Sequence, residues 1–369
     1  MQKHFILVFL LLVFTTEKIV SSVPNNAGKT LSQESESNVE AEIKHLTDSL
    51  CKHIKDKQEQ VKAIYKWIAQ NISYDVTCVN TPNTNSLGVR LRHVMEKRYG
   101  ICQHYSDLFV SMCGFIEVES WVVNGFTKQN NELSQLGHAW NVAKIYDDYF
   151  LFDVTWGAGY IKNGTFVKKY NPKFCMTSPA AFAKSHIPYE TYWQLQNYPI
   201  SFSEFIQGIA NTASVKTFYN YADSIKTILQ LEPYKLIIHK REQLKSSIAL
   251  SSLIRNEVDR LDIELANYYL NMSINAYNIY VLAKNEQFKN PKISDETVEK
   301  MIQMASLNLN LAERNLDGIT TQDKVLFKSL LAQKKYIKDY KPKVQNEMLF
   351  VEEYVQTSRL FRILLFYEF

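Results

Sequence analysis

The chain is poor in cysteine and has little excess charge of either sign. Its five cysteines in 369 residues are too few and too scattered for a disulfide-built fold. No C-x-x-C pair, His/Cys cluster of zinc-site spacing or calcium-loop pattern occurs, so we expect no metal and no cofactor. The 42 Lys and Arg against 38 Asp and Glu leave a net charge of +4 without a clustered basic face. This balance argues against nucleic acid as a partner.

Long apolar runs are also missing, except at the start of the chain. An unbroken apolar run from Phe5 to Phe14 follows a short basic start. About ten apolar residues fit a secretory signal better than a membrane-spanning helix, which needs roughly 20. Ser21 and Ser22 are small residues suited to cleavage, so we expect a signal peptide at 1–22. We therefore expect an exported protein (secreted, periplasmic or extracellular) without a stable membrane span. The alternative is that the segment stays uncleaved as a membrane anchor.

The remaining chain has enough apolar material for two domains, since 46% of the residues are hydrophobic. A polar segment at 23–40 is expected to be a flexible linker. We expect the first domain at 41–205 and a mainly α-helical domain at 206–369, where the segments show helix-like spacing. In that second half, residues 233–240 fit a short strand equally well.

Within the first domain, helical patterns come first and strand patterns later, which is typical of an α+β fold. Helices are expected within 41–72, where Val61, Ile64, Tyr65 and Ile68 have the i, i+3, i+4, i+7 spacing of a buried face, at 89–97, and from Cys102 to a stop at Gly114. Strands are expected at 117–123, 138–146 and 149–154, with a polar, mobile loop at 127–136.

Cys102 is a candidate nucleophile because it follows Tyr99-Gly100 at the expected start of a helix. The N–H groups and the positive dipole end of a helix N-terminus favour thiolate over thiol. The alternative is that Cys102 is buried and inert, as a lone cysteine usually is.

His138 and Asp153 are expected on the same face of one hairpin. If Tyr146-Asp147 forms the tight turn, paired positions sum to 293, so Asp153 is opposite Trp140 and diagonal to His138. A turn at Asp147-Asp148 keeps the shared face but places the two residues one step farther apart. A histidine next to a carboxylate is what a thiol–imidazole–carboxylate triad requires.

Three motifs carry a resemblance to a known family. They are Tyr-Gly-Ile-Cys-Gln-His-Tyr at 99–105, Gly-His-Ala-Trp-Asn at 137–141 and Phe-Asp-Val-Thr-Trp-Gly-Ala-Gly at 152–159. Together they resemble the Cys, His and Asp motifs of the transglutaminase-like superfamily, in the branch that includes the kyphoscoliosis peptidase. The resemblance covers roughly residues 55–200. One departure is His104, where many members carry a small residue, which either narrows the pocket or has no effect.

The resemblance implies a papain-like core, in which a helix bearing the nucleophile packs on an antiparallel sheet bearing the histidine and the carboxylate. Cys102 would attack an acyl carbon, His138 would exchange protons, and Asp153 would orient His138. Trp140 and Trp156 flank these residues and are candidate substrate contacts, with hydrophobic packing as the alternative.

Two classes of function follow. The first is a thiol enzyme that acts on peptide or amide bonds of a protein or peptide substrate: a peptidase, an amidase or a transglutaminase. The second is a catalytically silent module that serves as a protein-interaction scaffold, with a protein partner bound by the helical domain. A third reading, a disulfide-stabilised structural protein, requires Cys102 to be paired.

Overall fold

The computed structural model describes residues 31–78, 86–129, 131–208, 217–245, 247, 249, 251–289 and 293–368. The expected signal peptide lies outside these residues, as does the first part of the expected linker. The linker prediction is wrong from Leu31 onward, because helix α2 begins there and continues to Cys51. Val39 and Ile43, one helical turn apart, are both buried and anchor this polar helix.

The described chain separates into two compact units. One is built from residues up to 120 and from 154–172, and the other from 121–153 and from 173 onward. The expected domain boundary after residue 205 therefore falls inside the second unit. Every helix in the described part of the chain is too short or too polar to cross a bilayer.

The first unit is mainly helical. Its elements are α2 (Leu31–Cys51), α3 (Lys57–Asn71), β1 (Ser73–Tyr74), α4 (Leu87–Lys97), β2 (Tyr99–Gly100), α5 (Cys102–Phe115), α6 (Val154–Ala158), β6 (Gly159–Lys162) and β7 (Thr165–Lys168). The predicted apolar face of α3 is buried, as expected from its spacing. Helix α5 begins at Cys102 as predicted and runs one residue past Gly114, which lies in its last turn.

A four-stranded sheet organises the second unit, in the order β5-β4-β3-β8. Its strands are β3 (Glu119–Gln129), whose first two residues belong to the first unit, β4 (Glu132–Ile145), β5 (Asp148–Phe152) and β8 (His186–Pro188). The register of β4 and β5 pairs Asn141 with Phe152 and Ile145 with Asp148, so paired positions sum to 293 as predicted. Tyr146 has a φ of 57° in the turn, within the left-handed region that tight hairpins use.

The predicted mobile loop at 127–136 is wrong, because β3 extends to Gln129 and β4 starts at Glu132. The side chains there are mostly polar, and polar strand ends resemble a loop in the sequence. Backbone hydrogen bonds between neighbouring strands hold such a segment whether or not its side chains are apolar.

Two hydrophobic clusters cover the sheet. Val123 and Phe126 are three residues apart on β3 and so point to opposite faces. The cluster on the Val123 side contains Trp140, Val142, Leu151, Phe182, Tyr192, Trp193, Leu195, Ile225 and Ile228. The cluster on the Phe126 side contains Ile187, Tyr189, Phe205, Leu244, Ile254, Val258 and Leu261. Residues from the helical half of the chain thus complete the core of the sheet.

The remaining elements of the second unit are short turns followed by helices. They are η1 (Pro172–Phe174), α7 (Pro179–Phe182), η2 (Thr191–Gln194), α8 (Phe202–Gln207), α9 (Tyr221–Ile228), α10 (Pro233–Lys245), α11 (Ser252–Lys289), α12 (Asp295–Leu316), α13 (Lys324–Gln356) and α14 (Arg362–Glu368). Residues 233–240, which the sequence left open, are therefore helical. The prediction of a mainly helical second half is confirmed.

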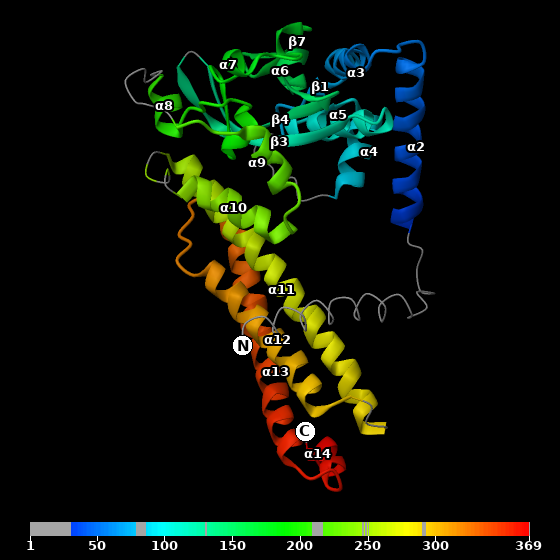
Figure 1. Ribbon diagram of the computed structural model, residues 1–369, viewed down its shortest axis with the longest axis vertical. Helices are drawn as coiled ribbons and strands as arrows, with labels where there is room; N and C mark the ends of the chain where they lie inside the picture. The colour runs from blue at the N-terminus through cyan, green and yellow to red at the C-terminus, as the bar shows by residue number, and fades with distance from the viewer. Residues whose placement is uncertain are drawn as a thin grey trace. The chain divides into compact units, whose positions relative to one another are not determined.

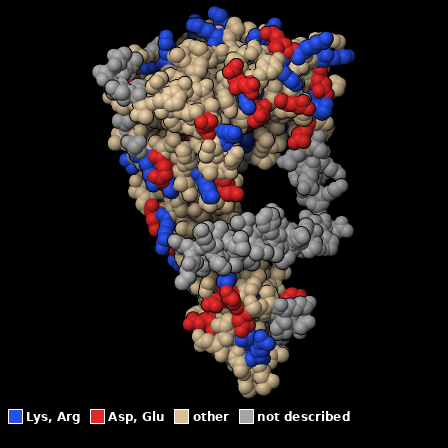
Figure 2. All heavy atoms as spheres, viewed as in Figure 1, with Lys and Arg blue, Asp and Glu red and all other residues tan. Residues whose placement is uncertain are grey.

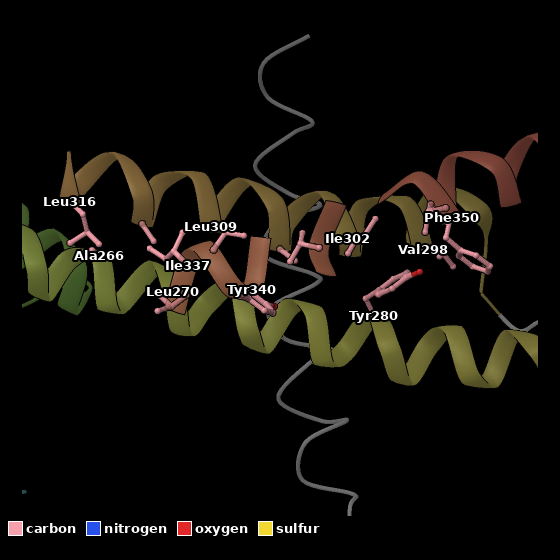
Figure 3. Close-up of a cluster of buried hydrophobic side chains, with 14 of the residues drawn as sticks. Ala266, Leu270, Tyr280, Val298, Ile302, Leu309, Leu316, Ile337, Tyr340 and Phe350 are labelled. Carbon is pink, nitrogen blue, oxygen red and sulfur yellow. The ribbon is translucent and has the colours of Figure 1, made fainter. Parts of the chain in front are cut away.

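Helices α11, α12 and α13 run side by side (Figure 1). Their apolar side chains meet along the bundle axis, as Figure 3 shows for Leu270 and Tyr280 of α11, Ile302 and Leu309 of α12, and Tyr340 of α13. Burial of this shared stripe holds three long helices whose remaining surface is polar. On the face in Figure 2, acidic and basic side chains are interspersed over the described residues.

Polar contacts also join α10 to the segment after β8. The Gln243 side-chain oxygen accepts hydrogen bonds from the backbone N–H and the hydroxyl of Thr191, both at 2.9 Å. Lys240 lies between Glu190, at 4.0 Å, and Glu257, at 3.8 Å, with its ammonium 4.9 Å from the centroid of the Tyr189 ring. The sheet is thus attached to the helical part by side-chain hydrogen bonds and ion pairs as well as by apolar packing.

Candidate active site

Cys102 is the first residue of α5, directly after the β2 strand and a single extended residue, Ile101. Its side chain is half-buried, and its thiol is free, as are those of Cys51, Cys78 and Cys113. The reading in which Cys102 forms a disulfide is therefore not supported. The position at a helix N-terminus agrees with the sequence prediction and is one where a negative charge is stabilised.

His104 has a structural role at the same helix end. Its Nδ1 accepts a hydrogen bond from the backbone N–H of Ile101 at 3.2 Å, which caps the first turn of α5. Burial, together with the neighbouring His93 ring, lowers the pKa of His104 to about 4. The neutral ring therefore has a lone pair with which to accept this bond at pH 7.

Gly100 fits beneath the His104 ring. A Cβ at this position would lie 2.7 Å from the His104 Cβ, which is closer than real Cβ contacts. The departure that the sequence shows at position 104 thus comes with a glycine that accommodates it, since Gly100 has no side chain to collide with the capping imidazole.

A buried ion pair holds the next turn of α5. Asp107 accepts hydrogen bonds from the Arg90 guanidinium of α4 at 2.6 Å and from the Gln103 side-chain amide at 2.8 Å. The first two turns of α5, which carry Cys102, are therefore fixed both by the cap and by a link to α4.

His138 and Asp153 are in contact, as the hairpin register predicts. The His138 Nε2 donates to the Asp153 Oδ2 at 2.9 Å. His138 lies within β4, and Asp153 directly follows β5. The His138 side chain is 9% exposed and that of Asp153 is fully buried. This arrangement gives His138 the Nε2–H tautomer and places its lone pair on Nδ1.

A second histidine, which the sequence analysis missed, contacts the same carboxylate. The His186 Nε2 lies 3.0 Å from the Asp153 Oδ2, so one carboxylate oxygen receives both imidazoles. His186 is the first residue of β8, and its side chain is fully buried. The pairing of Thr127 with His186 brings it next to β3.

The charge of Asp153 depends on these two rings. Burial by itself would raise the pKa of the carboxyl group, but the charge and hydrogen bonds of His138 and His186 outweigh it and hold the pKa of Asp153 well below its usual range. Burial, with the neighbouring His138, lowers the pKa of His186 although the hydrogen bond and charge of Asp153 raise it. The site at neutral pH therefore contains an ionised Asp153 and a neutral His186.

Three atoms from His138, Asp153 and His186 lie within 4.8 Å of one another, a grouping that can in principle hold a metal ion. In this arrangement both Nε2 atoms bear the protons donated to Asp153, so neither presents a lone pair to a cation. The donor set fits a hydrogen-bonded chain, and we assign no metal to it.

The two tryptophans differ in their surroundings. Trp140 is 1% exposed and packs against His186 and Phe182, with ring centroids at 5.2 and 5.8 Å, so its surroundings favour the packing role. Its ring lies over Gly125, where an added Cβ would be 2.5 Å from the indole. Trp156 is half-buried within α6, and its contact with substrate stays a prediction.

Comparison with known proteins identifies the family of this domain. Residues 44–154 match the model of the transglutaminase-like superfamily. They form a transglutaminase-like domain. Mouse kyphoscoliosis peptidase is 28% identical over 190 residues, which cover 49% of this chain and 28% of that protein. The human protein of that name is 27% identical over 186 residues, covering 48% and 27%.

These relatives place the transglutaminase-like domain in the kyphoscoliosis-peptidase-like branch, as the sequence motifs indicate. The matched residues span little more than a quarter of the length of either relative. A solved structure described as a TGase is 17% identical, covers 43% of this chain and 41% of its own, and has a TM-score of 0.28. The family model and these relatives agree with the transglutaminase-like motifs of the sequence.

Proposed function

We propose that the transglutaminase-like domain is a thiol-dependent acyl-transfer enzyme acting on peptide or amide bonds. Cys102 is the nucleophile, His138 the general base and acid, and Asp153 the group that orients His138. The hydrogen bond between His138 Nε2 and the buried, ionised Asp153 carries this proposal. An imidazole held by a carboxylate at one nitrogen presents its other nitrogen as a base, which is the arrangement a thiol nucleophile requires.

The position of Cys102 supports its assigned role. It is the first residue of a 14-residue helix, its thiol is free, and its side chain is partly accessible. Developing negative charge on a sulfur is stabilised at such a helix end. The backbone N–H groups of the same turn are suited to receive the oxyanion of the tetrahedral intermediate, with that of Cys102 as the first donor.

The proposed reaction has two steps. In the first, the Cys102 proton passes to His138 Nδ1 while the sulfur bonds to the acyl carbon, and the C–N bond then breaks as His138 returns a proton to the departing amine. In the second, His138 takes a proton from water or from an amine, which attacks the thioester and releases the Cys102 thiol. Both variants share the thioester, so the triad is compatible with hydrolysis and with transamidation.

We take water as the first acceptor to test. Both matched relatives are named peptidases, and a peptidase transfers the acyl group to water. The acyl donor is an amide bond whether water or an amine is the acceptor. A protein or peptide is therefore the proposed substrate class. A primary amine such as biotin-cadaverine added to the same assay detects transamidation, because it becomes covalently attached to the acyl donor.

The decisive experiment compares the reactivity of two thiols in the native protein. Cys78 is an exposed free thiol and serves as the reference within the chain. Cys102 is expected to react with iodoacetamide at pH 6 at least tenfold faster than Cys78, since an ordinary thiol with a pKa of ~8.5 is almost fully protonated there. Site-resolved mass spectrometry over pH 5–9 measures both rates.

Matched variants separate the possible results. Cys102→Ser should abolish the fast labelling and His138→Gln should slow it to the Cys78 rate, whereas Cys78→Ser should leave it unchanged. Equal rates for Cys102 and Cys78 at every pH would remove the basis for the enzyme. That outcome would favour the second candidate, a silent module that binds a protein partner.

A further inference from the structure

The hydrogen-bonded chain does not end at Asp153. His186 donates to the same carboxylate oxygen as His138, and its other nitrogen, Nδ1, lies 2.8 Å from the Ser185 hydroxyl. A neutral imidazole that donates through Nε2 accepts through Nδ1, and the Ser185 O–H can donate to it, since Nδ1 is nearer to the hydroxyl than the Phe182 carbonyl at 3.5 Å. The order of groups is Ser185, His186, Asp153 and His138.

We infer that His186 is a positioning residue: with Ser185 behind it, it holds the Asp153 carboxylate in the one rotamer that fixes His138 as the Nε2–H tautomer. This inference rests on the proposed function, because the tautomer matters only if the His138 Nδ1 is the base. It assigns a role to a residue that lies 33 positions from Asp153 in the chain, at the start of strand β8.

The surroundings of His186 leave its ring little freedom. It stacks on Phe182 with centroids 4.0 Å apart and an interplanar angle of 25°. The Trp140 ring meets it edge-on at 5.2 Å, and the Phe174 ring at 6.2 Å. A fully buried imidazole enclosed by three aromatic rings keeps its orientation, so its N–H is a fixed reference for the carboxylate.

Asp153 needs such a reference because a carboxylate can rotate about its last torsion. Its backbone is fixed by the N–H donated to the Phe174 carbonyl at 2.9 Å. The two imidazoles converge on Oδ2 from different strands, and rotation of the carboxylate would break both bonds. The His186 N–H thus holds Oδ2 from a direction that is independent of His138.

Two substitutions separate hydrogen bonding from packing. His186→Phe keeps an aromatic ring between Phe182 and Trp140 but removes the N–H. His186→Gln removes the ring but keeps an N–H near the Nε2 position. A merely structural role predicts that the Phe variant is the milder of the two, whereas a positioning role predicts the opposite. His53→Phe, at an exposed site, is the matched control for changing a histidine.

The primary readout is the tautomer of His138, measured by nitrogen-15 NMR on protein labelled at its eight histidines, with His138→Gln providing the assignment. The wild type and His53→Phe should show Nε2–H for His138. His186→Phe should show a mixture of tautomers and at least a tenfold slower labelling of Cys102. His186→Gln should retain the Nε2–H form and label within about threefold of the wild type.

Unchanged His138 signals and Cys102 labelling in a folded His186→Phe protein would overturn the inference. Ser185→Ala provides the test if His186→Phe does not fold: a shift of the His186 tautomer with a change at His138 supports the chain, and no change at His138 contradicts it. A wild-type Cys102 that labels like Cys78 would remove the proposed enzyme, yet the His138 tautomer would still decide the role of His186.

Discussion

At the scale of single residues, the buried negative charge of Asp153 is the feature of the site that most needs hydrogen-bond donors. A fully buried carboxylate loses its hydration, which costs several kcal/mol unless donors replace the water. Here two imidazole N–H groups do so, at 2.9 and 3.0 Å, and the pKa of Asp153 falls well below its usual range. Folding and the proposed chemistry therefore depend on the same two hydrogen bonds.

Replacement of Asp153 by asparagine should affect both the stability of the fold and the reactivity of Cys102. Stability from a carboxyl group whose folded pKa is lowered is fully present above the unfolded pKa of about 3.9 and is lost as pH falls toward the folded value. Asp153→Asn should therefore unfold about 1–3 kcal/mol more easily at pH 7, with a shallower loss of stability between pH 5 and 2. Urea titrations at several pH values measure both quantities.

The same substitution should lower Cys102 labelling at pH 6 at least tenfold, toward the Cys78 rate, because His138 without its carboxylate partner no longer stabilises the Cys102 thiolate. Asp148→Asn, at an exposed position of the same hairpin, is the control and should change neither property. Equal acid sensitivity of Asp153→Asn and the wild type would contradict the lowered pKa of Asp153.

The sequence predicts one of the two partners of Asp153 and misses the other. The contact of His138 with Asp153 is predictable because both residues belong to one hairpin, where a tight turn fixes the register of every pair. His186 lies on a three-residue strand that pairs with β3 across more than 55 intervening residues. Such a short strand has no measurable periodicity, and no local rule specifies a long-range partner. Ser185-His186 alone gave no signal of a site.

At the scale of elements, helix α6 depends on a glycine. Gly157 lies against the fully buried Tyr65 of α3, whose hydroxyl donates to the Asn171 carbonyl at 2.9 Å. A Cβ at Gly157 would be 1.9 Å from the Tyr65 hydroxyl oxygen and 2.5 Å from the carbon that bears it. The close packing of α3 and α6 thus requires a residue without a side chain.

Gly157→Ala should therefore destabilise the protein by about 2–4 kcal/mol, through overpacking and loss of the Tyr65 hydrogen bond. Gly114→Ala is the matched control, since nothing lies within 4 Å of an added Cβ there. Alanine in that helical turn should stabilise by about 0.5–1 kcal/mol. Urea midpoints of the two variants give the comparison, and a neutral Gly157→Ala would show that α3 and α6 are not closely packed.

Helix positions proved easier to predict than strand ends and the linker. The buried face of α3 and the start of α5 follow from apolar spacing and from Gly100, both of which are local signals. The extent of β3 and β4 and the helix at 31–40 do not, because these segments are rich in polar residues in the sequence. Backbone pairing holds the strand ends, and two buried side chains anchor the helix, so average polarity does not reveal either.

At the scale of the whole molecule, the division of the chain differs from the simple order of a catalytic domain followed by a helical one. The hydrophobic cluster on the Phe126 side of the sheet includes Leu244, Ile254, Val258 and Leu261 from α10 and α11. Burial of such side chains stabilises by about 1.5–3 kcal/mol each. The helical residues are part of the core of the sheet that carries His138.

A fragment of residues 41–205 should therefore fail to fold into a stable, soluble domain, despite containing all three candidate catalytic residues. It lacks the apolar side chains that cover Phe126 and Ile187, and it lacks Gln243, which binds Thr191. We expect binding of a hydrophobic dye and no cooperative thermal transition by circular dichroism. Residues 41–289, which add α10 and α11, are the control and should show a sharper transition.

The covering of this sheet by α10 and α11 has a consequence for synthesis on the ribosome. Cys102, His138 and Asp153 are all translated before the residues that cover Phe126 and Ile187, the last of which is Leu261. At about 5–20 residues per second, the interval between residues 205 and 261 lasts roughly 3–11 s. During that interval the nascent chain presents an uncovered apolar sheet face, so the transglutaminase-like domain completes its fold only after α11 has emerged.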